Sequence, residues 1–395
     1  MVEAEPGRTP RGNSNDHLRR HNLSTILRLV HHERAISRSR LTQVMGLNRS
    51  TIGALVAELV DRDLVTESEA EATRQVGRPS LVVRPSSGPV GIAVNPEIDA
   101  ITIGVVGLGG TVLAATRHPL SHIPTAVDAV AIIAGLLDDL RPSLTTAHRI
   151  VGVGVAVPGQ VRASDGLVRL APHLGWRDEP FAALLQEATA LPVFADNDAH
   201  LGARAESAFG GGRGVGDLLY INGGASGIGG GVIANGRPLT GADGYAGELG
   251  HTMVNPSGAA CHCGGVGCLE TEVRRERLLE LVGLDAGAAA SLAEAFAASD
   301  DPAVGAEVDR QLGLLAVAIR NAVNLLNPRL ILLGGFLAAL HSAAPQRLAD
   351  FGADRPLAAS GESLQIRPAA LGPDLLMIGA AELAFEPLLA DPASF

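Results

Sequence analysis

The feature that most constrains this chain is a short glycine-rich loop that holds all three of its cysteines, Cys261, Cys263 and Cys268. His251 stands ten residues before the first of them. One imidazole and three thiolates are enough to complete a tetrahedral zinc site, and the glycines let the backbone turn tightly enough for neighbouring sulfurs to reach one ion. His262, between two of the cysteines, is an alternative ligand. The odd cysteine count disfavours a disulfide framework, and three unrelated thiols are the other alternative. We predict a structural zinc.

Composition limits the class of protein. A chain of 395 residues with 46% hydrophobic residues is long enough and apolar enough for two or three folded domains. No apolar run approaches the roughly 18 to 20 residues that span a bilayer, and the first twenty residues carry no apolar signal segment. The sequence therefore predicts a cytoplasmic protein that does not contact a membrane.

The charge is distributed unevenly. The net charge is −11, yet residues 1–88 hold 13 arginines against 10 acidic residues, and residues 89–395 hold 18 arginines against 32 acidic residues. A basic head on an acidic body is the asymmetry expected of a DNA-binding module fused to another unit. We expect a flexible tail over residues 1–14 and the DNA-binding head over residues 15–88.

The head has the pattern of a winged helix-turn-helix. Apolar spacing predicts a helix to about His32, a second over Ser37–Met45, and a third from the N-cap Asn48 to about Arg62, with Gly46 at the turn. Strand-like stretches at 64–66 and 80–83 predict a two-stranded wing, with the basic segment 77–79 at its tip. A protein-interaction module is the alternative. The first turn of the recognition helix and the wing tip contact DNA in such folds, so the candidate DNA-binding residues are Asn48, Arg49, Ser50, Thr51, Ala54 and Arg78.

The body alternates strands and helices, which predicts an α/β fold. Strands are expected at 90–94, 100–106 and 111–116, followed by a helix at 126–140 and a buried strand at 150–157. Further strands are expected near Phe194 and at 218–221, 228–234 and 330–333, with a long helix at 310–324 before the last of them.

Three motifs in the body carry a family resemblance. Asp196-Asn197-Asp198, the segment Glu248-Leu249-Gly250-His251 and the cysteine loop through Glu270 resemble those of the ROK family of repressors and sugar kinases. The resemblance implies an actin-like fold of two lobes with sugar in the cleft between them. Lobe 1 would comprise 89–197 and 375–395, and lobe 2 would comprise 198–374 with the zinc loop. The head matches the repressor branch, whose members act as homodimers or homotetramers.

Some of the sugar-binding residues can also be argued from chemistry. Asn197 and Asp198 follow a strand, at the sheet edge where α/β folds bind ligands, and an amide beside a carboxylate can hold two adjacent hydroxyls. Capping of the helix that begins at Ala199 is the alternative. By resemblance, Asp198 is the base in kinases and a hydroxyl acceptor in repressors. His251 would bind zinc through one nitrogen and sugar through the other. Taken alone, the glutamates are ordinary surface charges. The resemblance implies sugar contacts at Gly159, Asn197, Asp198, Glu248, His251 and Glu270, with His173 nearby.

The first phosphate-binding loop of a kinase is missing. ATP-using members carry Asp-x-Gly-Gly-Thr after the first strand, whereas this chain has Asn95-Pro96-Glu97-Ile98-Asp99, without a glycine and with a carboxylate that would repel phosphate. A glycine cluster at 107–110 falls at a hairpin turn instead. Glycines at 223–231 and 334–335 fit either close packing or an adenosine site. We predict a non-enzymatic, sugar-responsive regulator, a repressor of carbohydrate-metabolism genes that binds operator DNA and a sugar or sugar phosphate. The alternative is an ATP-dependent sugar kinase with a DNA-binding head.

Overall fold

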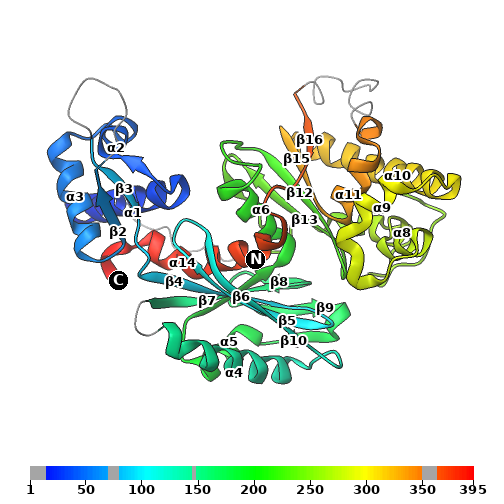
Figure 1. Cartoon of the computed structure of the whole chain (residues 1–395), viewed down its shortest axis with the longest axis horizontal. Helices are drawn as coiled ribbons and strands as arrows, with labels where there is room; N and C mark the ends of the chain where they lie inside the picture. Colours follow the sequence, from blue (N-terminus) through cyan, green and yellow to red (C-terminus); the bar gives the residue numbers. More distant parts are fainter. Residues whose placement is uncertain (1–14, 70–79, 145–147, 349–362) are drawn as a thin grey trace, which may run out of the picture.

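The computed structural model describes residues 15–69, 80–144, 148–348 and 363–395. Figure 1 shows an amino-terminal head and two lobes. Each lobe is built on a five-stranded sheet. We name the lobe with the sheet order β11-β7-β4-β5-β6 lobe 1, and the lobe with the order β14-β13-β12-β15-β16 lobe 2. The α/β class and the two-lobed body predicted from the sequence are confirmed.

The head consists of three helices and a small antiparallel sheet. Its helices are α1 (Asn15–Glu33), α2 (Arg38–Met45) and α3 (Arg49–Asp61), and its sheet has the order β1-β3-β2, formed by Ile36–Ser37, Val82–Pro85 and Val65–Ser68. Ser37 caps α2, Gly46 ends it in a left-handed conformation (φ 65°), and Asn48 caps α3. The same capping residues and the same glycine turn mark the ends of these helices in the sequence. The short strand β1 was not predicted, and the wing tip with Arg78 lies outside the described residues.

Lobe 1 is a mixed sheet with helices on both faces. The hairpins β4–β5–β6 are antiparallel, while β7 and β11 run parallel to β4 because helices α4 and α5 connect them. A small sheet of β8, β9 and β10 follows β7. The elements are β4 (Pro89–Pro96), β5 (Ala100–Gly107), β6 (Thr111–Pro119), α4 (Ala126–Leu144), β7 (Arg149–Val157), β8 (Gln160–Arg162), β9 (Leu167–Ala171), β10 (Trp176–Glu179), α5 (Phe181–Thr189) and β11 (Val193–Asn197).

Alternate residues of β4 pack against different layers. Ile92 and Val94 share a core with Ile133 of α4, whereas Ala93 faces the opposite core with the carboxyl-terminal helix α14 (Leu375–Ala390). A Cβ at Gly154 would overlap the backbone of α14. Glycine therefore allows α14 to lie directly on the lobe 1 sheet.

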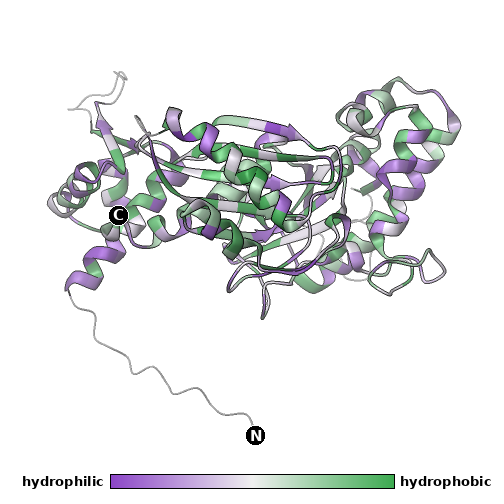
Figure 2. Ribbon diagram, turned by 90° about the horizontal axis from the view of Figure 1, so that it is seen from below, coloured by the Kyte–Doolittle hydropathy of each residue, from purple (hydrophilic) through white to green (hydrophobic). Residues whose placement is uncertain are grey.

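Lobe 2 carries the second sheet and a group of helices on its outer face. In Figure 2 the strands at the centre of the molecule carry many hydrophobic residues, and the outer helices carry both hydrophilic and hydrophobic residues. Helix α10 begins at Pro302, eight residues before the expected start at Arg310, because Asp301 caps it there. The elements are β12 (Leu218–Gly224), β13 (Gly227–Ala234), β14 (Arg237–Pro238), α7 (Leu269–Glu272), α8 (Arg275–Val282), α9 (Leu292–Ala298), α10 (Pro302–Leu326), β15 (Leu330–Gly335), α11 (Phe336–Ala343) and β16 (Gln365–Pro368).

Helix α6 (Asp198–Phe209) connects the lobes. It packs against β12 and β13 of lobe 2 and against α14, which itself lies on the lobe 1 sheet. Its first turn follows directly from β11 of lobe 1. A single helix therefore begins between the lobes and is held by both of them.

The head is docked on lobe 1 through α1 and α14. Arg28 pairs with Glu386 at 2.7 Å, and the buried His31 Nε2 lies 2.8 Å from Glu382 Oε1. The Gly109 N–H donates to His31 Nδ1 at 2.9 Å, so Nε2 carries the proton that is donated to Glu382. Head and lobe 1 residues also share one apolar core. The head is thus continuous with the body rather than joined by a free linker.

Among the described helices, no single one is long and apolar enough to cross a bilayer. The segments 269–282 and 287–298, bent by 85°, meet the length and composition limits only as a pair.

Candidate ligand pocket and metal centre

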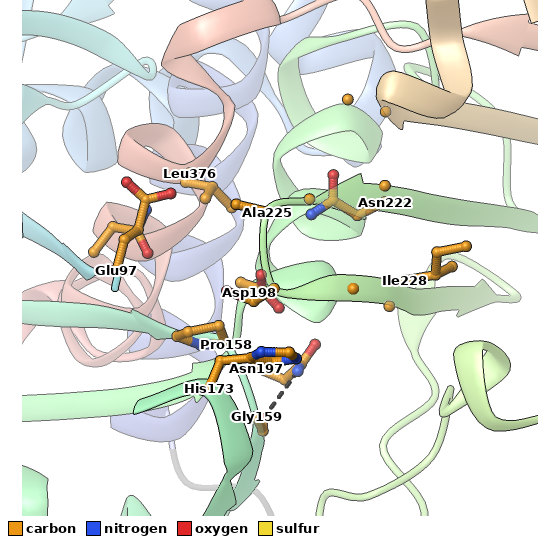
Figure 3. A pocket seen from close by; sticks show the side chains of 18 of the residues that line it. Glu97, Pro158, Gly159, His173, Asn197, Asp198, Asn222, Ala225, Ile228 and Leu376 are labelled. Atoms are coloured by element: carbon orange, nitrogen blue, oxygen red, sulfur yellow. Dashed lines mark hydrogen bonds between the residues drawn. The ribbon is translucent and has the colours of Figure 1, made fainter. Parts of the chain in front are cut away.

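A cavity of about 810 Å³ lies between the two lobes and is lined by residues of both. This volume is in the range of small-molecule sites. Figure 3 shows Glu97, Asn197 and Asp198 on one side of it and Asn222 and Ile228 on the other. All six predicted sugar-binding residues line the cavity, namely Gly159, Asn197, Asp198, Glu248, His251 and Glu270.

Asn197 joins the helix cap to the cavity wall. Its Oδ1 accepts from the N–H groups of Ala199 at 2.9 Å and His200 at 3.2 Å, and its Nδ2 donates to the Gly159 carbonyl at 2.9 Å (Figure 3). A Cβ at Gly159 would overlap the Leu170 carbonyl, so only glycine fits there. The capping alternative is therefore realised, and one Nδ2 hydrogen is left for a ligand.

Asp198 opens α6 at the centre of the cavity. Its Oδ1 accepts from the Ala199 N–H at 2.8 Å. Burial raises the pKa of Asp198 to about 6, and the negative charges of Glu97 and Glu248 act in the same direction. A carboxylate held at a helix start in the wall of a cavity is a strong acceptor for a hydroxyl group.

Glu270 is surrounded by the histidines of the cysteine loop. Its Oε1 lies 3.1 Å from His262 Nδ1 and 3.8 Å from His251 Nδ1. His262 also lines the cavity, and its ring meets that of His173 edge-on at 6.1 Å. The sequence suggested His262 as an alternative metal ligand; its side chain lies against Glu270, and donor atoms of His251, His262 and Glu270 also lie within 4.8 Å of one another.

The predicted metal ligands converge. One donor atom from each of His251, Cys261, Cys263 and Cys268 lies within 4.8 Å of the others. Cys261 Sγ is 3.6 Å from His251 Nδ1, and Cys263 Sγ is 3.6 Å from Cys268 Sγ. Such separations match the edges of a tetrahedron with Zn–S bonds of about 2.3 Å. The donor set therefore fits zinc, with His251 Nδ1 toward the metal.

The backbone of the cysteine loop explains this convergence. Isolated bridges pair Met253 with Cys268 and Ala260 with Val266. A Cβ at Gly267 (φ 65°) would overlap the Asn255 carbonyl, so that only glycine fits this turn. Burial raises the pKa of Cys268 to about 12. A metal ion is what would hold such a thiol in its anionic form.

A buried histidine that sequence reasoning missed positions the loop around Glu248. His200 Nδ1 lies 3.0 Å from Asp196 Oδ1, and its Nε2 donates to the Ala246 carbonyl at 2.5 Å. Both neighbours are acceptors, so both ring nitrogens donate and the imidazolium is favoured. Desolvation is the largest single effect and opposes that charge, but the hydrogen bonds to Asp196 and Ala246 and the charges of Asp196 and Glu248 together outweigh it, and the pKa of His200 is raised. Its i, i+4 spacing from Asp196 was the signal available in the sequence.

The glycine-rich turns of lobe 2 are closely packed. A Cβ at Gly223 would lie 2.7 Å from side-chain atoms of Phe336 and Leu337, and one at Gly334 would overlap Tyr220. Both glycines also line the cavity. Gly223 and Gly334 are therefore closely packed, and an adenosine site beside them stays a prediction that close packing does not test.

The predicted DNA-binding residues of α3 gather at its start. Asn48 Oδ1 accepts from the Thr51 N–H at 2.8 Å and from Ser50 Oγ at 2.7 Å. Arg49 and Ser50 are exposed. Within the described part of the chain, no ion-pair partner of Arg49 is present. The first turn of α3 thus presents a guanidinium and hydroxyl groups to solvent.

Comparison with known proteins places these features in one family. A model described as the ROK family matches residues 92–386. The xylose repressor of Caldicellulosiruptor bescii is 26% identical over 398 aligned residues, covering 95% of this chain and 98% of that protein. The glucokinase of Halalkalibacterium halodurans is 34% identical over 288 residues, covering 65% of this chain and 85% of the enzyme. The crystal structure of an ROK family transcriptional regulator, a homologue of the E. coli MLC protein, matches with a TM-score of 0.77 at 27% identity, covering 95% of this chain and 98% of that one. The chain belongs to the ROK family.

Proposed function

We propose that this chain is a sugar-responsive transcriptional repressor. The head would bind operator DNA through α3, and a sugar in the cavity between the lobes would release it. The observation that carries the proposal is the continuity of head and body: α1 and α14 share a core with lobe 1, whose sheet edge supplies Asn197 and Asp198. Similarity to a xylose repressor over 95% of the chain supports the same function.

The release would follow from differential affinity. A sugar that contacts both walls of the cavity binds one arrangement of the lobes more tightly and raises its population. The head moves with lobe 1, so the spacing of two heads in an assembly would change. A homodimer or homotetramer on a palindromic operator, in the cytoplasm, is the assembly we propose.

Zinc is the metal we propose for the cysteine loop. His251 Nδ1 would bind the ion and its Nε2 would face the sugar, since His251 lines the cavity. The ion would supply no chemistry in this role. It would hold the loop so that His251 and Glu270 meet the ligand.

The competing function is phosphotransfer, which the similarity to a glucokinase suggests. Kinase chemistry needs backbone amides and a metal-binding carboxylate around the phosphates. At that position β4 ends at Pro96, which has no N–H, and Glu97 follows with its side chain in the cavity. The cavity therefore lacks the first phosphate loop, and we propose that the chain is not an enzyme.

Fluorescence anisotropy tests the proposal. A labelled duplex from the region upstream of the chain's own coding sequence would be titrated with protein and then with sugars including D-xylose and D-glucose. We expect binding that one sugar reverses. Arg49→Ala should weaken operator binding at least about tenfold, whereas Arg177→Ala, an exposed arginine in lobe 1, should leave it within about twofold. ADP formation with a sugar and ATP, without DNA binding, would favour the kinase instead.

A further inference from the structure

We infer that the cavity selects an unphosphorylated sugar and that Glu97 excludes phosphate esters. The inference rests on the proposed sugar response and names the chemical class of its ligand. It depends on the charges that line the cavity, on the position of Glu97 and on the partial charges of nearby helix ends.

Carboxylates dominate the cavity wall. Four acidic side chains line it, those of Glu97, Asp198, Glu248 and Glu270, against one arginine among the described lining residues, Arg117. Arg117 is already paired with Asp99 at 2.7 Å. Three thiolates and one neutral imidazole around Zn²⁺ would leave a net charge of −1, so the metal centre would add no positive charge for an anion.

Glu97 is held in place by the turn that follows β4. Its N–H donates to the Ala100 carbonyl at 2.8 Å, which fixes the hairpin between β4 and β5. Burial raises the pKa of Glu97, and Asp99 adds to that shift. Arg117, a hydrogen bond with Asn95 and, from lobe 2, Arg275 act in the opposite direction, and Arg275 Nε also lies 3.5 Å from Glu276. Glu97 and Asp198 thus face the same cavity, and the charge of Glu97 helps to raise the pKa of Asp198.

Besides Arg117, helix ends oppose the negative charge of the described cavity wall. The start of α6 is already occupied by Asn197 and Asp198. The start of α11, at Phe336, has no side-chain cap and reaches the cavity at Gly335. A helix end carries about half a positive charge, whereas a phosphate monoester carries about −1.5 to −2. Repulsion from the four carboxylates therefore outweighs this attraction, while the hydroxyls of a neutral sugar are suitable donors for Asp198, Glu248 and Glu270.

Isothermal titration calorimetry of the zinc-loaded full chain tests the inference. The probes are D-xylose, D-glucose, N-acetyl-D-glucosamine and the terminal phosphate ester of each. We expect at least one free sugar to bind, and its ester to bind at least about tenfold more weakly. Glu97→Gln should reduce that ratio at least about threefold and leave the Kd of the free sugar within about threefold. Glu187→Gln, which removes an exposed charge from α5 of the same lobe, should leave the ratio unchanged.

The possible failures are distinguishable. An ester that binds the wild-type chain as tightly as its free sugar overturns the inference but leaves the sugar response intact. A ratio that Glu97→Gln and Glu187→Gln alter equally would overturn the role of Glu97, because only the overall charge would then matter. Absence of binding by every sugar and every ester, with zinc content and thermal unfolding confirming a folded chain, contradicts the proposed function together with the inference.

Discussion

At the scale of single residues, the sugar contact proposed for Asp198 would carry a cost in stability. Its carboxylate lies at the start of α6, where a hydroxyl of the ligand can donate to it, yet burial raises its pKa from 3.8 to about 6. Because the folded state binds the proton more tightly than the unfolded state, ionisation of Asp198 destabilises the fold above pH 6 and has no effect below about pH 4. A bound sugar whose hydroxyl donates to the Asp198 carboxylate should offset this loss of stability.

Asp198→Asn should therefore stabilise the free protein and weaken sugar binding. We expect the free energy of unfolding at pH 7.5 to rise by about 1 kcal/mol and the affinity for the active sugar to fall at least about tenfold. The amide oxygen can still accept from the Ala199 N–H. Denaturant unfolding at pH 7.5 and pH 4 and calorimetry check both parts. A stabilisation that persists at pH 4 would mean that the charge of Asp198 is not its origin.

Asn197 and Asp198 can be identified from the sequence because the pattern that marks them lies in neighbouring residues. Asn197 and Asp198 follow an apolar strand and precede a helix, and the structure gathers them with the other four predicted sugar-binding residues around one cavity. Their contacts with sugar stay predictions. The hydrogen bond from His200 to the Ala246 carbonyl joins residues 46 positions apart. No periodic or capping pattern in the sequence predicts such a contact.

At the scale of elements, the cysteine loop connects the proposed metal centre to the cavity between the lobes. Cys268 directly precedes α7, whose residue Glu270 lines the cavity, and His251 belongs to both sites. The loop 261–268 has three glycines among its eight residues and consists of short turns, so it has little regular structure to stabilise it. Ion binding would therefore contribute much of its order.

Cys263→Ser should weaken zinc binding, sugar binding and operator binding together. We expect the zinc content to fall from about one ion per chain and the sugar affinity to fall at least about tenfold. Elemental analysis, calorimetry and anisotropy measure the three effects. His262→Ala is the matched control, since His262 lies between two ligand cysteines yet contacts Glu270, and it should retain the metal. Unchanged sugar and operator binding in Cys263→Ser would contradict the proposed dependence of both on the metal centre.

Elements with local signals were predicted well, and those that depend on distant partners were not. The caps at Ser37 and Asn48 and the turn at Gly46 mark α2 and α3 in the sequence as they do in the structure. The two-residue strand β1 exists only because β3, about 45 residues later, pairs with it. So short a segment has no periodicity to detect.

At the scale of the whole molecule, the docking of the head was beyond sequence analysis. His31 and Glu382 are 351 residues apart, and the hydrogen bond between them is buried. Phe209, the last residue of α6, meets the His31 ring edge-on at 5.2 Å, and Arg34 lies 5.3 Å from the centre of its ring. The helix that starts at the ligand cavity thus ends against the head.

Phe209→Leu should reduce the coupling between sugar and DNA while preserving each binding site. Leucine keeps most of the buried volume but loses the ring contacts with His31 and Arg34. We expect both dissociation constants to stay within about threefold, and the sugar-induced loss of operator affinity to shrink at least about threefold. Phe296→Leu in α9 is the control, because Phe209 and Phe296 are equally buried, each 8% exposed. If both variants reduce the coupling equally, the reduction would come from general loosening of the core and not from the ring contacts of Phe209.

The position of α6 has a mechanical consequence. Its 12 residues form a rod about 18 Å long that contains no proline. A rotation of about 5° at its cavity end would displace its far end by about 1.5 Å, by simple leverage over that length. Displacement of that size is enough to shift the packing of side chains in a dense core. We therefore expect the effect of sugar binding to reach the head as a tilt of α6, without local unfolding of the helix. This change should occur on the timescale of domain motions rather than on that of refolding.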